Sequence, residues 1–203
     1  MWVAILGATG TGKRYISSFL EKDGFELLDH DPIESHGNSF QEEFRYMLSR
    51  FKLQMLAFEK ASKDRDVITI RSVSCVFHAR MQAALKLTTL KEEEYDLLAS
   101  AYEELSELLV PRAPDFVIYA HTNDMSAMDR MLLNNDSKLE VTPEFHKLEL
   151  DGYARFMDKV RVPRIDIDVS RKPKQIEDEL EFSINSLKMN SVGKNTIWQK
   201  RWF

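Results

Sequence analysis

The sequence has few of the residues that would mark a secreted or membrane-spanning protein. Its 203 residues include a single cysteine, Cys75, so no internal disulfide can form, and this fits a reducing compartment. No apolar run approaches the roughly 20 residues that span a bilayer. The N-terminus, MWVAILGATG, has too short an apolar run for a signal peptide and no basic segment before it. We therefore expect a soluble, cytoplasmic protein with no membrane partner.

An excess of positive charge is also missing. The net charge is -5 at pH 7, whereas a domain that grips duplex DNA by its phosphates is usually basic. Nucleic acid is therefore not favoured as a partner, although a local basic patch stays open. Hydrophobic residues make up 43% of the chain, which is enough for a sizeable core. The length suits one α/β domain, or at most two small ones.

Short apolar runs alternate with longer amphipathic segments along the chain. The runs predict strands at 2–6, 25–29, 67–71, 115–120 and 164–169. Helical spacing predicts helices at 15–21, 41–62, 72–85, 91–110, 125–133 and 143–160, and a last helix marked by Ile176, Leu180, Ile184 and Leu187. This alternation predicts an α/β fold of three layers, with a five-stranded parallel sheet flanked by helices. Ligands of such sheets bind at the carboxyl ends of the strands.

The stretch GATGTGKR lies between the first strand and the first helix. It matches the P-loop pattern G-x-x-x-x-G-K-[ST], which binds phosphate, in all but its last residue. In such a loop the backbone N–H groups converge on phosphate oxygens, and the positive end of the next helix assists them. The lysine reaches the β- and γ-phosphates of a nucleotide. We expect ATP to bind to Gly7, Ala8, Thr9, Gly10, Thr11, Gly12, Lys13 and Arg14; the ordinary alternative is a glycine-rich turn with a solvated lysine.

Arg14 stands where the pattern has the hydroxyl that binds Mg²⁺. Three interpretations follow. Mg²⁺ is held by carboxylates and water, Arg14 points outward as an ordinary helix-surface residue, or catalysis has been lost. The first two are compatible with each other. The five histidines show no metal-binding spacing, so we assign no protein ligand to a metal, although Mg²⁺ is expected to accompany ATP.

Two charged residues follow strands at the same predicted edge as the loop. Asp31 comes after the second strand and can orient or deprotonate an acceptor hydroxyl; the alternative is a turn-forming Asp-Pro. Arg71 ends the third strand and can stabilise charge on a transferring phosphoryl group; the alternative is a surface salt bridge. With Lys13, these two are the predicted catalytic residues.

Several of these patterns together resemble the deoxynucleoside kinases, P-loop kinases that phosphorylate the 5′-hydroxyl of deoxynucleosides. The resemblance covers residues 1 to about 170. Asp31-Pro32 stands where the family has Glu-Pro with its catalytic glutamate. Ile70-Arg71-Ser72 keeps the end of the family's Glu-Arg-Ser motif but not the glutamate. The resemblance therefore implies that Asp31 is the catalytic base.

The same resemblance implies a set of substrate contacts. Leu48-Ser49-Arg50, followed by Gln54, matches the Leu-Ser-Arg of the family's long helix, and Arg130 falls at the start of its lid. Glu149 matches the glutamate that holds the sugar 3′-hydroxyl, with Tyr153 nearby. The implied substrate-binding residues are thus Arg50, Gln54, Arg130 and Glu149. The chain departs from the family where Asn134 and Asp136 replace two lid arginines, and where Gln41 and Glu43 are the nearest residues to the glutamine that reads the base.

These observations favour ATP-dependent phosphoryl transfer to a hydroxyl of a small deoxynucleoside-type substrate. One alternative is a kinase for a nucleoside monophosphate or for a modified base in DNA. Another is a catalytically inactive nucleotide-binding or scaffold module, which the missing loop hydroxyl and lid arginines support. We expect a kinase-like domain over residues 1–190, with a short lid near 134–142. A homodimer stays open.

The C-terminal segment 191–203 is basic and aromatic, ending in KNTIWQKRWF. Aromatic residues interleaved with cations can stack on bases and contact phosphates. They can also dock onto the domain or onto a second subunit, and we favour this interpretation because a short isolated tail is a weak nucleic-acid signal.

Overall fold

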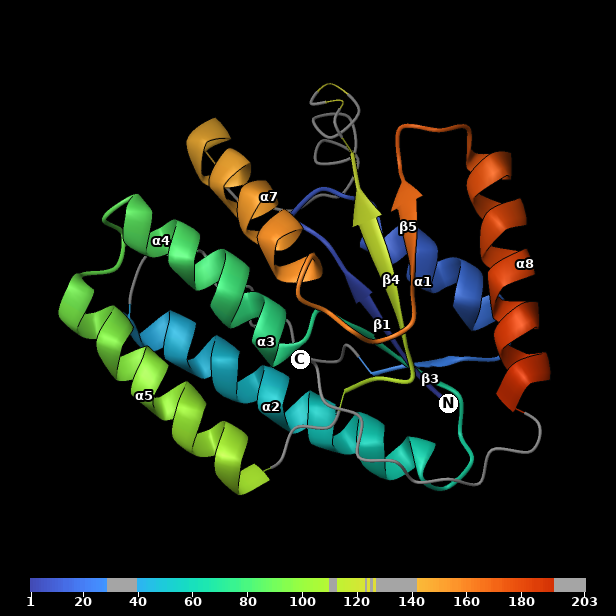
Figure 1. Ribbon diagram of the computed structural model, residues 1–203, viewed down its shortest axis with the longest axis horizontal. Coiled ribbons are helices and arrows are strands. Elements are labelled where there is room, and N and C mark those ends of the chain that lie inside the picture. The colour runs from blue at the N-terminus through green and yellow to red at the C-terminus, as the bar shows by residue number, and fades with distance from the viewer. Residues whose placement is uncertain (29–39, 110–112, 123, 125, 127–141, 192–203) are drawn as a thin grey trace.

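The computed structural model describes residues 1–28, 40–109, 113–122, 124, 126 and 142–191. These residues form a sheet of five parallel strands between two layers of helices (Figure 1). The three-layer α/β fold predicted from the sequence is therefore confirmed. None of the helices described is long and apolar enough to cross a membrane.

The first strand lies at the centre of the sheet. The strand order is β2-β3-β1-β4-β5, with β1 Trp2–Leu6, β2 Glu26–Leu27, β3 Val67–Ile70, β4 Phe116–His121 and β5 Arg164–Asp168. All five residues of β1 are buried, because helices cover both faces of the sheet. The side chains of Val3 and Ile5 pack into one core, while those of Ala4 and Leu6 pack into the other.

Two helices, α1 Lys13–Lys22 and α8 Pro173–Ser191, cover one face of the sheet (Figure 1). The other face carries α2 Phe40–Ala61, α5 Glu92–Leu109, α7 Pro143–Met157 and a helical stretch made of α3 Val73–Cys75, the π-helical η1 Val76–Met81 and α4 Gln82–Lys86. The carboxyl ends of the parallel strands share one edge, so the residues that follow β1, β3 and β4 are brought together there.

The predicted elements differ from the structure mainly at their ends. The second strand is only two residues long, although we expected a strand over 25–29, and its neighbour Phe25 packs into the core instead. The first helix begins two residues early, at Lys13, directly after the loop. The helix from Pro143 ends at Met157 rather than at 160. Almost all of the predicted helix at 125–133, the predicted lid near 134–142 and the tail at 191–203 lies outside the described residues.

The π-helical stretch packs unusually closely against α7. A Cβ atom at Gly152 would lie 2.8 Å from Cα of Ala79 and 3.1 Å from its carbonyl oxygen. The absence of a side chain at Gly152 therefore lets the two backbones touch. A π-helical turn changes the direction of the side chains that follow it and occurs often at functional sites. This contact fixes α7, which carries two residues of the site described below.

We expect Gly152→Ala to lower the free energy of unfolding by about 1–3 kcal/mol, as overpacking usually does. The atoms in the way belong to the backbone of Ala79, which cannot rotate aside. Urea denaturation monitored by circular dichroism measures the change. The sign of this change shows whether the two helices touch, because replacing a glycine in an open helix would instead stabilise the protein by about 0.5–1 kcal/mol. A more stable variant would show that the two helices do not approach this closely.

Candidate active site

The loop between β1 and α1 has the backbone of a phosphate cradle. Gly7 has a φ of 146°, and a Cβ there would lie 2.2 Å from the carbonyl oxygen of Ala120 at the end of β4. Gly12 has a φ of 64° and forms the N-cap of α1. These left-handed conformations favour glycine, so the sequence pattern follows from the shape of the loop. The loop leads directly into the N-terminus of α1, whose N–H groups and partial positive charge favour an anion.

Lys13 is the first residue of α1, and its side chain folds back over the loop. Its ammonium donates to the carbonyl oxygen of Ala8 and lies 3.5 Å from Oγ1 of Thr11. Lys13 is only 9% exposed, so the charge is held against the loop rather than in solvent. This excludes the solvated lysine that the sequence left open. The ammonium lies where a loop lysine can meet phosphate oxygens.

Arg71 brings the end of β3 to the same loop. Its backbone is left-handed, with a φ of 65°, and its N–H donates to the carbonyl oxygen of Ile5 at 2.8 Å. The guanidinium donates to the hydroxyl of Tyr46 and to Oγ1 of Thr9, both at 2.8 Å, and lies 3.3 Å from Oε1 of Glu149. A non-glycine residue rarely adopts this backbone conformation, and such residues cluster at functional sites. Arg71 is therefore part of the loop's surroundings, and its ion pair with Glu149 is buried rather than on the surface.

Glu149 is fully buried and lies on the inner face of α7. Its Oε2 accepts the Thr9 N–H at 2.8 Å. Burial is the largest single effect and would raise the pKa of this carboxyl, whereas the guanidinium groups of Arg71 and Arg80 act to lower it. Together with the Thr9 N–H and the Lys13 ammonium, they hold the pKa of Glu149 below its ordinary value. The carboxylate is therefore ionised at neutral pH, and it is the negative centre of a group of cations.

Arg50 and Gln54 lie on α2 and hold the backbone on either side of Arg71. The guanidinium of Arg50 donates to the carbonyl oxygen of Ile70 at 2.9 Å, and Oε1 of Gln54 accepts the Val73 N–H at 3.3 Å. Both side chains are buried. Their contacts fix the connection that gives Arg71 its unusual conformation.

Arg14 is exposed on the first turn of α1. Its carbonyl oxygen accepts the hydroxyls of Ser17 and Ser18, each at 2.9 Å. This position agrees with the interpretation of Arg14 as a helix-surface residue. Two other predicted site residues, Asp31 and Arg130, lie outside the described residues, as do Asn134 and Asp136.

Tyr46, His146 and Arg80 contact the site but are not among the residues predicted from the sequence. Tyr46 accepts from Arg71, and its ring lies under the guanidinium of Arg50, 4.8 Å from ring centroid to Cζ. Nε2 of His146 contacts the carbonyl oxygen of Thr9. One sequence signal could have pointed to Tyr46. The otherwise apolar buried face of α2 carries a row of polar residues, namely Glu43, Tyr46, Arg50 and Gln54.

Arg80 belongs to the π-helical stretch and forms a buried ion pair with Glu43, Nε to Oε1, at 3.4 Å. Its guanidinium also lies over the rings of Tyr46 and Phe145. The ion pair and the ring contact with Phe145 together connect α2, η1 and α7. Within the described residues, no three side chains of histidine, cysteine, aspartate or glutamate gather as a metal site would require.

No protein-family model matches this sequence, and no curated protein matches it either. Solved structures of a deoxyadenosine kinase from M. mycoides do resemble it. The structure with the products dCMP and a flexible dCDP has a TM-score of 0.70 at 18% identity, over 93% of this chain and all of that chain. The structure with bound dATP has a TM-score of 0.69 at 19% identity, again over 93% of this chain and 100% of the other.

A third structure of that enzyme, with bound dCTP, has a TM-score of 0.66 at 21% identity and covers 92% of this chain and 100% of the other. At such identities the likeness establishes the fold. The chain thus shares the fold of these deoxyadenosine kinase structures, a fold that the sequence resemblance implied, at low sequence identity.

The lowered pKa of Glu149 predicts how stability depends on pH. A carboxyl whose folded-state pKa lies below its ordinary value of 4.5 stabilises the folded protein above that pH. This contribution is lost as the pH falls through the folded-state value. The stability difference between the wild type and Glu149→Gln should therefore shrink on acidification below about pH 4.5. Urea titrations between pH 7 and pH 3 measure it, with the exposed Glu144→Gln on the same helix as the control. A difference that does not change with pH would contradict an ionised Glu149.

Proposed function

We propose that this chain is a kinase that transfers the terminal phosphoryl group of ATP to a hydroxyl of a deoxynucleoside-type substrate. The observation that carries the proposal is that the side chains of both Lys13 and Arg71 contact one glycine loop at the N-terminus of α1. Phosphoryl transfer needs positioning and positive charge more than covalent chemistry from the protein. The nucleotides bound to the M. mycoides enzyme of the same fold, dATP and dCTP among them, support a nucleotide as the ligand.

In this proposal the loop from Gly7 to Lys13 holds the β- and γ-phosphates, and Arg14 contributes through its backbone at the first turn of α1. Arg71 stabilises the charge on the transferring group. Asp31 is the base that orients or deprotonates the acceptor hydroxyl, and Arg130 approaches the phosphates from the lid. Arg50 and Gln54 were expected to contact the substrate. Their bonds to Ile70 and Val73 support a role in holding the backbone of Arg71.

Mg²⁺ would accompany ATP in this site. The described residues offer little to bind it, because no three side chains of histidine, cysteine, aspartate or glutamate gather among them as a metal site would require. Mg²⁺ commonly keeps several waters and binds through substrate phosphates. We therefore propose that phosphate oxygens and water hold most of its coordination sphere. When bound, the ion neutralises charge on the phosphates.

A nucleotide-binding module without catalytic activity is the second candidate. One observation favours it: Arg14 stands where the loop pattern has the hydroxyl that binds Mg²⁺. Losing that hydroxyl leaves the backbone of the loop able to bind phosphate but weakens the support for phosphoryl transfer.

Phosphoryl transfer separates the two candidates. The full chain is incubated with Mg²⁺ and γ-labelled ATP, together with deoxynucleosides, nucleoside monophosphates or DNA that contains modified bases. We expect label on a deoxynucleoside, and loss of both ATP binding and transfer in Lys13→Met, because the ammonium contacts the phosphates. Lys22→Met, at the exposed far end of the same helix, is the matched control. ATP binding without any transfer would favour the inactive module, and no ATP binding would reject both candidates.

Asp31→Asn tests the proposed base. The variant keeps a polar side chain of the same size but cannot accept a proton, so the rate should fall by at least about 10²-fold, the usual contribution of a general base. ATP affinity should stay within about threefold, because Asp31 is assigned to the acceptor and not to the loop. Steady-state rates and equilibrium ATP titrations give the two numbers. The control is Asp23→Asn at the exposed end of α1, and an equal rate in both variants would remove Asp31 from the mechanism.

A further inference from the structure

The backbone of one loop residue, Thr9, is held from both sides by α7. Its N–H donates to Oε2 of Glu149 at 2.8 Å. Its carbonyl oxygen contacts Nε2 of His146. A carbonyl oxygen only accepts hydrogen bonds, so Nε2 of His146 carries the hydrogen and donates it. His146 and Glu149 are three residues apart on the same face of α7, which allows both to reach one residue of the loop.

These contacts are shielded from water. Thr9 is 8% exposed, His146 is 3% exposed and Glu149 is 0% exposed. Hydrogen bonds in such surroundings are stronger than in water, and a buried group left without its partner is costly. The side chain of Thr9 is held as well, because its Oγ1 accepts from Arg71. All polar groups of Thr9 are therefore bonded to residues outside the loop.

Thr9 lies at the start of the loop, before the left-handed Gly10 and Gly12. The N–H groups that can converge on a phosphate come after it, at the first turn of α1. The hydrogen bonds to Thr9 thus fix the N-terminal part of the loop and leave the N–H groups of its C-terminal part to bind the ligand. The anchor is itself rigid, because α7 is pressed against the π-helical stretch at Gly152.

We propose that Glu149 and His146 are positioning residues that fix the loop in the shape that binds a triphosphate. Neither residue contacts the acceptor substrate. The inference rests on the nucleotide-binding part of the proposed function but not on phosphoryl transfer. It gives Glu149 a different role from the sugar contact that the family resemblance implied, because its carboxylate already binds Thr9 and Arg71.

Two pairs of variants test the hydrogen bonds separately from charge. Glu149→Gln keeps an oxygen that can accept from Thr9, whereas Glu149→Leu does not, and both have lost the negative charge. His146→Gln keeps a donor nitrogen near the position of Nε2, whereas His146→Phe keeps only a ring. In each pair the apolar variant should bind a non-hydrolysable ATP analogue about tenfold more weakly than the amide variant, the effect of one buried hydrogen bond left unmade. Calorimetric titration of the full chain measures these affinities.

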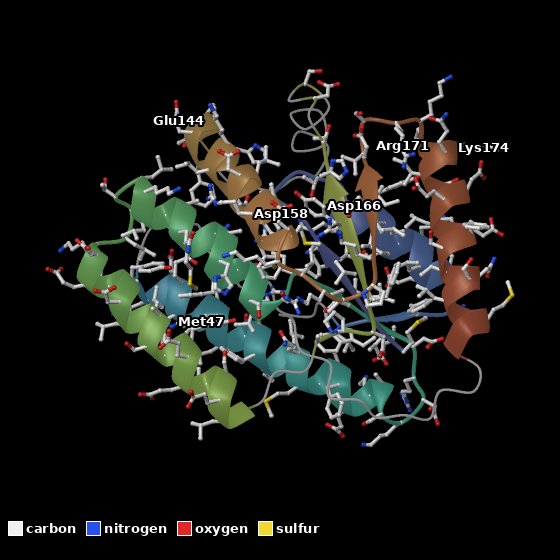
Figure 2. All side chains as sticks on the ribbon, viewed as in Figure 1. Met47, Glu144, Asp158, Asp166, Arg171 and Lys174 are labelled. Carbon is white, nitrogen blue, oxygen red and sulfur yellow. The ribbon has the colours of Figure 1, made fainter. Side chains whose placement is uncertain are left out.

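The control variant is Glu144→Gln, which removes one exposed carboxylate near the N-terminus of α7 (Figure 2). It should bind the analogue with an affinity within about twofold of the wild type. Equal affinities within both pairs would overturn the proposal. So would an unchanged ATP affinity with a raised KM for the acceptor in the Glu149 variants, because that pattern belongs to a substrate ligand. If the protein binds ATP but transfers no phosphoryl group, the kinase proposal is rejected. The affinities of the variant pairs still test the role of Glu149 and His146, because they do not depend on transfer.

Amide hydrogen exchange gives a second measurement if a Glu149 variant does not fold. In the wild-type protein the Thr9 N–H should be protected, because its acceptor is buried. In His146→Phe the same amide should exchange at least about tenfold faster than in His146→Gln, since the hydrogen bond from residue 146 to the Thr9 carbonyl oxygen has been removed. A Thr9 amide that exchanges freely in the wild type would overturn the proposed anchor directly.

Discussion

The ionised carboxylate of Glu149 lies out of contact with water, and much of the site is arranged around it. A buried charge is tolerated only when it is paired and hydrogen-bonded. Here the partners come from separate parts of the chain: Arg71 from the end of β3, Arg80 from the π-helical stretch, Lys13 from α1 and the Thr9 N–H from the loop. Removing the carboxylate would leave several cations facing one another. This one charge therefore joins the sheet edge, the loop and α7 into a single unit.

Because the site is arranged around a buried carboxylate, its charged side chains are paired with one another inside the protein, unlike those of a surface patch. Arg50 and Gln54 hold the backbone that turns Arg71 toward Thr9. Positioning groups of this kind act through other residues, and a site built on them holds its geometry without a bound ligand. The same rigidity is consistent with either candidate function, because a preformed loop serves a kinase and an inactive nucleotide-binding module equally well.

The sequence predicted the sheet, its five strands and the loop, because these features leave local signals. Apolar runs mark buried strands, and the glycines at positions 7 and 12 mark backbone that other residues rarely adopt. The partners of Glu149 left no such signal, since contacts between residue 149 and residues 9 and 71 depend on tertiary packing. The π-helical turn was also invisible. The segment Val76–Met81 is buried almost all round, so its periodicity does not distinguish one helical form from another.

The central place of β1 has a consequence for how the chain folds. Its two neighbours in the sheet come from residues 67–70 and 116–119, so β3 can pair with one edge of β1 well before β4 is available for the other. Until β4 has been made, the wholly apolar side chains of β1 and its second backbone edge are open to other strands. Parallel pairings between distant segments form slowly, and unpaired apolar edges promote aggregation during synthesis. The strand that presents the loop therefore needs protection from other chains until β4 has been made.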